Sequence, residues 1–114
     1  MVEQNEIVPS GMWRMEHNTY FIFVLPLAER KFVTYLEFLA LVSESAVMRM
    51  QQAYHEALDF IERYPESCPL YSHNPRYRYK LFGGRYRIVF EIVGQAVYAY
   101  DIQDCREDID KSLI

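Results

Sequence analysis

Basic side chains alternate with tyrosines in the segment 76–87, RYRYKLFGGRYR, which contains no acidic residue. Its five cations are Arg76, Arg78, Lys80, Arg85 and Arg87. Guanidinium and ammonium groups at such short spacing attract oxyanions, which proteins meet as the phosphate backbone of a nucleic acid or as the carboxylates of an acidic partner. The segment is therefore predicted to form the functional surface of the molecule.

The rest of the chain is acidic. The 114 residues carry a formal net charge of −4 at pH 7, and outside the basic segment seven basic residues stand against sixteen acidic ones. An acidic body discourages indiscriminate binding of polyanions, while a local basic patch still attracts one at short range. The length suits a single domain with its own hydrophobic core.

The sequence predicts neither a metal nor a cofactor. Its two cysteines, Cys68 and Cys105, lie far apart, without a CxxC pair and without histidines at the spacing of metal ligands. We expect them to be reduced thiols, and a disulfide between them stays open at this point.

No apolar stretch of the sequence is long enough to form a membrane-spanning helix. The longest apolar run, 20–28, contains Pro26 and is far shorter than the roughly 20 residues that such a helix needs. Glu3 and Glu6 stand where a secretory signal has basic residues. We expect a cytoplasmic protein that makes no contact with a membrane.

The first half of the chain predicts one strand and a pair of helices. Residues 1–18 show no periodicity and are expected to be a flexible arm, which leaves 19–114 as the single domain. The aromatic and β-branched run TYFIFVLP predicts a strand that ends at Pro26. From Leu27 apolar residues recur at helical spacing, with charged residues, Lys31 among them, on the outer face. Ser43 or Ser45 caps a second helix that Pro65 ends, so the two helices form an antiparallel hairpin.

The second half predicts a three-stranded antiparallel meander. Alternation places Arg76, Arg78 and Lys80 on one face of a strand and the intervening tyrosines on the other. A turn at FGG leads to a strand at 85–93, and Gly94-Gln95 leads to a last strand at 96–102. The predicted fold is α+β, a four-stranded sheet with the hairpin on one face. All five cations are expected on the open face, because they cannot be buried unpaired beneath the helices.

The order and spacing of these elements resemble the toxin superfamily that unites RelE-type and ParE-type proteins of bacterial type II toxin–antitoxin operons, also called plasmid stabilisation proteins. The resemblance covers about 19–111. It rests on LPLAERKFVTYLEFL and AVMRMQQAYHEALDFIERYPE on the helical side, and on YRYKLFGGRYRIVFEIVGQAVYAYDIQDCRED on the sheet side. It implies a partner antitoxin, whose acidic segment would cover the basic face.

Two activities are known in that superfamily, and the resemblance carries both to this chain as expectations. RelE-type members are mRNA interferases that cut messenger RNA on the ribosome, and the resemblance assigns Lys80, Arg87 and Arg106 as catalytic. Arg87 would clamp the phosphate, and Lys80 or Arg78 would assist proton removal. Arg76, Arg78 and Arg85 would bind nucleic acid or the antitoxin. ParE-type members instead inhibit DNA gyrase by binding.

One part of the RelE-type pattern is missing. The tail after Asp101, IQDCREDIDKSLI, lacks the tyrosine or histidine that commonly serves as general acid in those enzymes. Tyr98 and Tyr100 lie earlier and would substitute only from the basic face. Cleavage of ribosome-bound messenger is the favoured interpretation, with gyrase inhibition, and a degenerate toxin that only binds its antitoxin, as alternatives.

Overall fold

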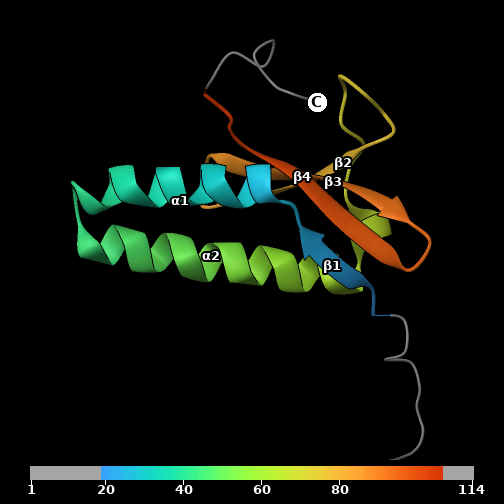
Figure 1. Ribbon diagram of the computed structural model, residues 1–114, viewed down its shortest axis with the longest axis horizontal. Helices are drawn as coiled ribbons and strands as arrows, with labels where there is room; N and C mark the ends of the chain where they lie inside the picture. Colours follow the sequence, from blue (N-terminus) through green and yellow to red (C-terminus); the bar gives the residue numbers. More distant parts are fainter. Residues whose placement is uncertain (1–18, 107–114) are drawn as a thin grey trace, which may run out of the picture.

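The structure, a computed structural model, describes residues 19–106, so the expected arm at 1–18 lies outside the described residues, as does 107–114. A strand and a helical hairpin are followed by a three-stranded meander (Figure 1). The elements are β1 (Phe21–Val24), α1 (Pro26–Ala40), α2 (Glu44–Arg63), the 3-10 turn η2 (Pro65–Ser67), β2 (Arg78–Phe82), β3 (Tyr86–Val93) and β4 (Ala96–Asp104). The predicted α+β architecture is confirmed.

The helix boundaries follow from local chemistry. Pro26 occupies the first turn of α1, where a missing N–H costs no hydrogen bond. Ser43 caps α2, because its Oγ accepts a hydrogen bond from the N–H of Ala46 at 3.2 Å. Pro65 ends α2 and begins η2. The predictions for Ser43 and Pro65 are confirmed.

The sheet has the strand order β1-β4-β3-β2 and is mixed. β1 pairs with β4 in parallel, and the last three strands form the predicted antiparallel meander. The turn between β2 and β3 contains Gly83 and Gly84 at φ 63° and 82°, a backbone conformation that favours glycine. Before β2, the N–H of Tyr71 bonds to the carbonyl of Tyr77 at 2.8 Å, so a short piece of the preceding loop pairs with the edge of the sheet.

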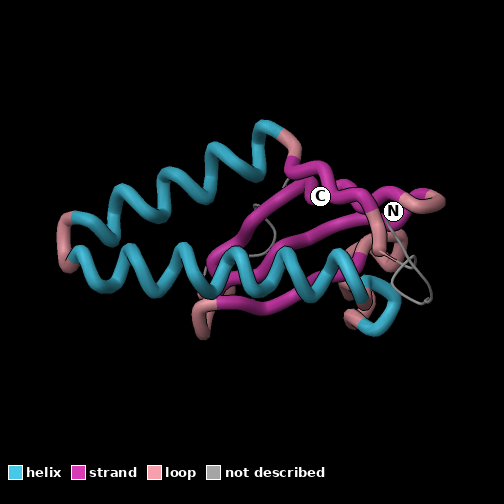
Figure 2. The backbone as a smooth tube through the Cα atoms, turned by 90° about the horizontal axis from the view of Figure 1, so that it is seen from below, coloured by secondary structure: helices cyan, strands magenta, loops and turns pink. Residues whose placement is uncertain are grey.

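The hairpin covers one face of the sheet and builds the core with it (Figure 2). Phe32 of α1 stacks on Tyr54 of α2 with ring centroids 3.8 Å apart, and both rings contact Phe82 of β2. Burial raises the pKa of the Tyr54 hydroxyl to about 12, so this ring stays neutral in the core. The core also contains Ala28, Met50, Ala57, Ile61, Ile88, Phe90, Val97, Ala99 and Ile102.

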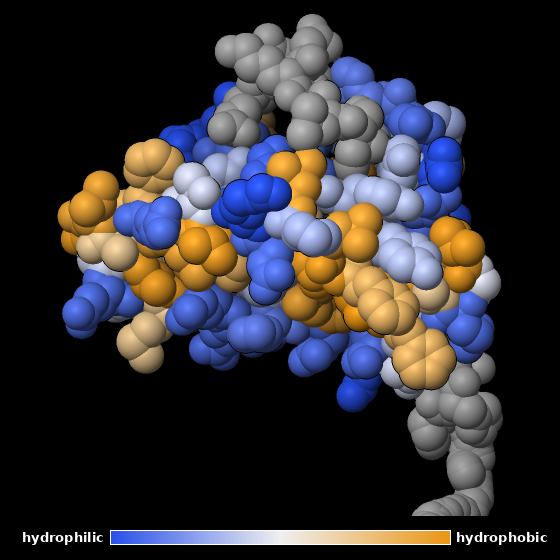
Figure 3. Space-filling model, viewed as in Figure 1, coloured by the Kyte–Doolittle hydropathy of each residue, from blue (hydrophilic) through white to orange (hydrophobic). Residues whose placement is uncertain are grey.

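The free end of the hairpin extends beyond the sheet, and the loop between the helices lies clear of the strands in both views (Figures 1 and 2). Large apolar side chains are exposed there, and Figure 3 shows hydrophobic residues gathered at this end. We call this surface the hairpin tip, and its members, each between 65% and 83% exposed, are Phe38, Leu41, Val42 and Met48. Within 19–106 no helix is long and apolar enough to cross a membrane.

Alternation along β2 gives a first prediction. Phe82→Ala should lower the free energy of unfolding by about 3–5 kcal/mol, because it removes a buried ring of β2 that contacts both helices. Leu81→Ala, one residue earlier and 56% exposed, should cost less than about 1 kcal/mol. Urea unfolding followed by circular dichroism measures both. Equal losses would contradict the assignment of Phe82 to the helix side.

Candidate binding site on the open face of the sheet

Arg78 and Lys80 lie on the helix side of the sheet, so the expectation that all five cations share the open face is wrong. They alternate in step with Phe82, whose burial under the hairpin fixes that side of β2. The Lys80 ammonium lies 4.3 Å from the centroid of the Phe60 ring of α2, in a groove of about 240 Å³ between α2 and β2. Arg78 donates to the carbonyls of Glu66 and Cys68. Both cations thus avoid unpaired burial at the sheet edge.

Arg85 and Arg106 share one carboxylate. Nη2 of Arg85 lies 2.9 Å from Oδ2 of Asp104, and Nη2 of Arg106 lies 3.4 Å from the same oxygen. Burial alone would raise the pKa of Asp104, but hydrogen bonds from the backbone and side chain of Arg106 and the charge of Arg85 outweigh it and lower the pKa. At the end of β4 these two cations therefore share a single negative charge.

Arg76 is also paired, on the open face. Its Nε lies 2.6 Å from Oε2 of Glu91, and the hydroxyl of Tyr100 donates to Oε1 of the same carboxylate at 3.1 Å. These hydrogen bonds, that of Arg76 above all, lower the pKa of Glu91. Burial and the bond to Glu91 raise the pKa of Tyr100, which disfavours release of its proton. The rings of Tyr77 and Tyr100 pack edge to face, with their centroids 5.4 Å apart.

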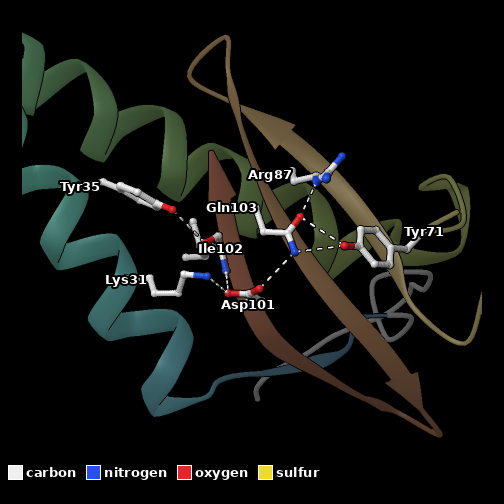
Figure 4. A network of polar contacts seen from close by, with 7 residues as sticks. All are labelled: Lys31, Tyr35, Tyr71, Arg87, Asp101, Ile102 and Gln103. Carbon is white, nitrogen blue, oxygen red and sulfur yellow. Dashed lines mark hydrogen bonds and ion pairs between the residues drawn. The ribbon is translucent and has the colours of Figure 1, made fainter. Parts of the chain in front are cut away.

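Arg87 lies at one end of a polar network on the open face, and Gln103 lies in the middle of that network (Figure 4). Its Nε donates to Oε1 of Gln103 at 2.7 Å, and its guanidinium lies 5.3 Å and 5.7 Å from the ring centroids of Tyr71 and Tyr79. Nε2 of Gln103 donates to the Tyr71 hydroxyl and to Oδ2 of Asp101, both at 3.1 Å. Two rings and an amide therefore fix the direction of this cation.

Asp101 anchors the network to the helices. Its side chain is fully buried, and its Oδ1 accepts hydrogen bonds from Lys31 of α1 at 2.7 Å and from the N–H of Ile102 at 2.9 Å. The sequence had placed Lys31 on the outer face of its helix. An irregularity in β4 explains the difference. Ala99 and Ile102 both point into the core, but two residues, Tyr100 and Asp101, lie between them. In a regular strand an odd number of residues separates two side chains on the same face.

The cysteines and possible metal ligands add no second site. Both cysteines are free, Cys68 buried and Cys105 exposed. Burial raises the pKa of the Cys68 thiol although Lys80 and Arg78 oppose it, which keeps the thiol protonated and unreactive. The described range 19–106 contains no group of three or more His, Cys, Asp and Glu side chains that could hold a metal ion.

Comparison with known proteins bears on the fold. No protein-family model matches the sequence, and no curated protein matches it. The structure is similar to a chain of the solved structure described as "Chromosomal ParDE TA system from P. aeruginosa", with a TM-score of 0.65 over 76% of this chain and 97% of that one. This chain has the RelE/ParE-type fold. The two sequences are 11% identical, so the likeness concerns the fold.

On this RelE/ParE-type fold the expected catalytic residues are dispersed. Lys80 contacts α2 on the helix side, Arg87 lies on the open side, and Arg106 pairs with Asp104 after β4. Among the residues with a possible role as general acid, Tyr100 is bonded to Glu91 and Tyr98 is stacked with Phe23 at 5.4 Å. The structure thus brings together Arg87, Gln103, Asp101 and two tyrosine rings, a set that the sequence does not predict.

The ion pair beneath the network yields a second prediction. Lys31→Met should lower the free energy of unfolding by about 3 kcal/mol, because it removes the ammonium group that pairs with the buried Asp101 carboxylate. Arg30→Met is the matched control, since Arg30 is exposed on the same helix and should cost less than about 0.5 kcal/mol. Denaturant unfolding at pH 7 measures both, and similar costs would show that the pair is unimportant.

The Arg76–Glu91 pair yields a third prediction, on pH. The lowered pKa of Glu91 means that the folded state favours its ionised form, so this contribution to stability is present above its unfolded pKa, about 4.3, and is lost as the pH falls through its folded pKa. The stability gap between wild type and Glu91→Gln should therefore close on acidification. Thermal unfolding between pH 7 and pH 3 measures it.

Glu37→Gln is the control, because Glu37 is exposed on α1 and makes no ion pair with any residue of 19–106. The difference in stability between Glu37→Gln and wild type should stay small at every pH. A gap for Glu91→Gln that stays constant with pH would contradict the stabilising role of the ionised pair.

Proposed function

We propose that this protein is the toxin component of a bacterial type II toxin–antitoxin system, acting in the cytoplasm by binding its target rather than by cutting RNA. The RelE/ParE-type fold supports the toxin assignment, as does the similarity to a chain of a ParDE system. A cognate antitoxin that neutralises it follows from that assignment. The proposed target is DNA gyrase, which ParE-type members of the resembled superfamily inhibit.

The observation that carries the choice of mechanism is the separation of Lys80 from Arg87. Cleavage of RNA by a metal-independent nuclease needs several groups that converge on one phosphate and are held in place before the reaction. Here the two residues face opposite sides of one sheet, and Arg106 is already bound to a carboxylate. This arrangement favours a protein that acts by contact, without a catalytic centre built from these three residues.

The hairpin tip supplies a surface for such a contact. Four residues at the free end of the helical hairpin are among the most exposed large apolar side chains of residues 19–106, namely Phe38, Leu41, Val42 and Met48. Exposed apolar patches of this kind mark protein interaction sites. A projecting end buries little area against a second projecting end, so its best fit is an apolar hollow in a larger protein such as the target enzyme.

The fourth prediction tests this mechanism in bacteria that express the protein from an inducible promoter. We expect growth arrest with impaired DNA supercoiling or broken DNA, and intact messenger RNA, measured by mapping DNA breaks and messenger 5′ ends in one culture. Phe38→Ser combined with Leu41→Ser should remove toxicity, because it makes the hairpin tip polar. Phe21→Ser is the matched control, because Phe21 is equally exposed but lies on β1.

Circular dichroism of the purified variants checks that they are folded. New in-frame cuts in translated messages that disappear in Arg87→Ala would contradict the proposal and restore the RelE-type mechanism. Normal growth with neither effect would identify a degenerate toxin.

A further inference from the structure

We infer that Arg87 is a prearranged receptor for one carboxylate of an acidic, partly apolar segment of the antitoxin, and that Gln103 is its positioning residue. The antitoxin as the source of that segment rests on the proposed function. The receptor itself is a property of this chain and can be tested without a partner.

Arg87 differs from the other arginines of the segment 76–87 in what it binds. Arg76 and Arg85 are paired with Glu91 and Asp104, and Arg78 is occupied by two carbonyls. Within 19–106 Arg87 meets no carboxylate, and its bond through Nε to a neutral amide leaves its full charge uncompensated. Lys80 also lacks a carboxylate partner, but it lies on the helix side over Phe60.

The geometry of the Arg87 guanidinium suits a carboxylate. Its Nε is held by Gln103, while the two terminal nitrogens make no hydrogen bond to any residue in 19–106. In Figure 4 the outermost of these nitrogens points away from Gln103. Two parallel N–H donors in one plane match the two oxygens of a carboxylate. Because the side chain is already fixed, little conformational entropy is lost when the anion binds.

Gln103 separates the charge of Asp101 from the charge of Arg87. Its amide donates to Asp101 and its oxygen accepts from Arg87, so the buried carboxylate reaches the arginine only through a neutral group. Lys31 pairs with Asp101 from the other side. A carboxylate at position 103 would itself neutralise Arg87. Gln103 therefore holds the guanidinium in place and leaves its charge for a partner.

The surroundings favour a protein segment over a nucleic acid. Binding along a phosphate backbone draws on several cations, and on this face Arg76 is already neutralised. Directly across the strand pair from Arg87 lies Leu81, an apolar residue that is largely exposed. Side chains at such paired positions lie about 5 Å apart. A partner segment with an acidic residue next to an apolar one would contact both Arg87 and Leu81. Amphipathic acidic segments have this composition.

The experiment is an NMR titration of the purified full chain that follows the Nε–Hε signals of arginine side chains at constant ionic strength. The probes are acetate, the capped tripeptide Leu-Glu-Leu and its counterpart Leu-Gln-Leu. We expect saturable shifts of the Arg87 signal with acetate and tighter binding of Leu-Glu-Leu. Leu-Gln-Leu should cause no saturable shift. Arg76 is already paired with Glu91, so its signal should shift only slightly and without saturation.

Variants separate the roles. Arg87→Gln should abolish binding of Leu-Glu-Leu, followed through backbone signals, and Arg76→Gln, with the same change of charge on the same face, should leave it within about twofold. Arg87→Lys should weaken binding because it loses the planar fork. Gln103→Met should weaken binding while the melting temperature of the variant stays close to that of wild type. If Gln103 had a purely structural role, binding would weaken only together with a loss of stability. Leu81→Ser should reduce the affinity for the tripeptide to that for acetate.

The absence of saturable binding of either carboxylate probe at Arg87 overturns the proposal. So does tighter binding of a single-stranded RNA hexamer than of Leu-Glu-Leu at the same residue, which would make the site one for phosphate. A chain that binds the tripeptide as expected but arrests no growth would retain the receptor while refuting the toxin function, so the two failures are distinguishable.

Discussion

The packing of three rings between the helices and the sheet governs the rest of this structure. Phe32, Tyr54 and Phe82 join both helices to β2, and their burial decides which face of that strand points inward. Since side chains alternate, the position of one phenylalanine assigns Arg78 and Lys80 to the helix side and leaves Leu81 outside. The same packing places Arg87, across from Leu81, on the open face. The distribution of charge over the surface is thus a consequence of core packing.

The sequence predicts the fold well, because its signals are local. Helical spacing, Ser43 as a cap, Pro65 as a stop and the paired glycines after β2 each determine an element without reference to the rest of the chain. The alternation of cations and tyrosines in β2 was likewise predictable. The side on which each set lies was not, because both kinds of side chain have an apolar stem and a polar end and so fit either face of an edge strand. Phe82 carried the missing signal.

The polar network could not be predicted, because it depends on an interruption of regular geometry. Alternation in β4 breaks between Ala99 and Ile102, and this break turns Asp101 to a place where a lysine from α1 reaches it. The resulting chain of contacts runs from a helix through Asp101 and Gln103 to Arg87. Buried polar groups arranged in this way are satisfied as a set, so the orientation of Arg87 is tied to the packing of the hairpin.

The short pairing of the loop before β2 with the edge of the sheet has a consequence for solubility. An edge strand with unpaired backbone groups is a template on which other chains can add, which leads to aggregation. Tyr71 bonds to Tyr77 across the first part of this edge, so the loop occupies backbone groups that a foreign strand would otherwise use. The opposite edge is formed in part by β1, whose four residues can pair with only a short foreign strand. Addition of a foreign strand is therefore hindered along part of each edge of the sheet.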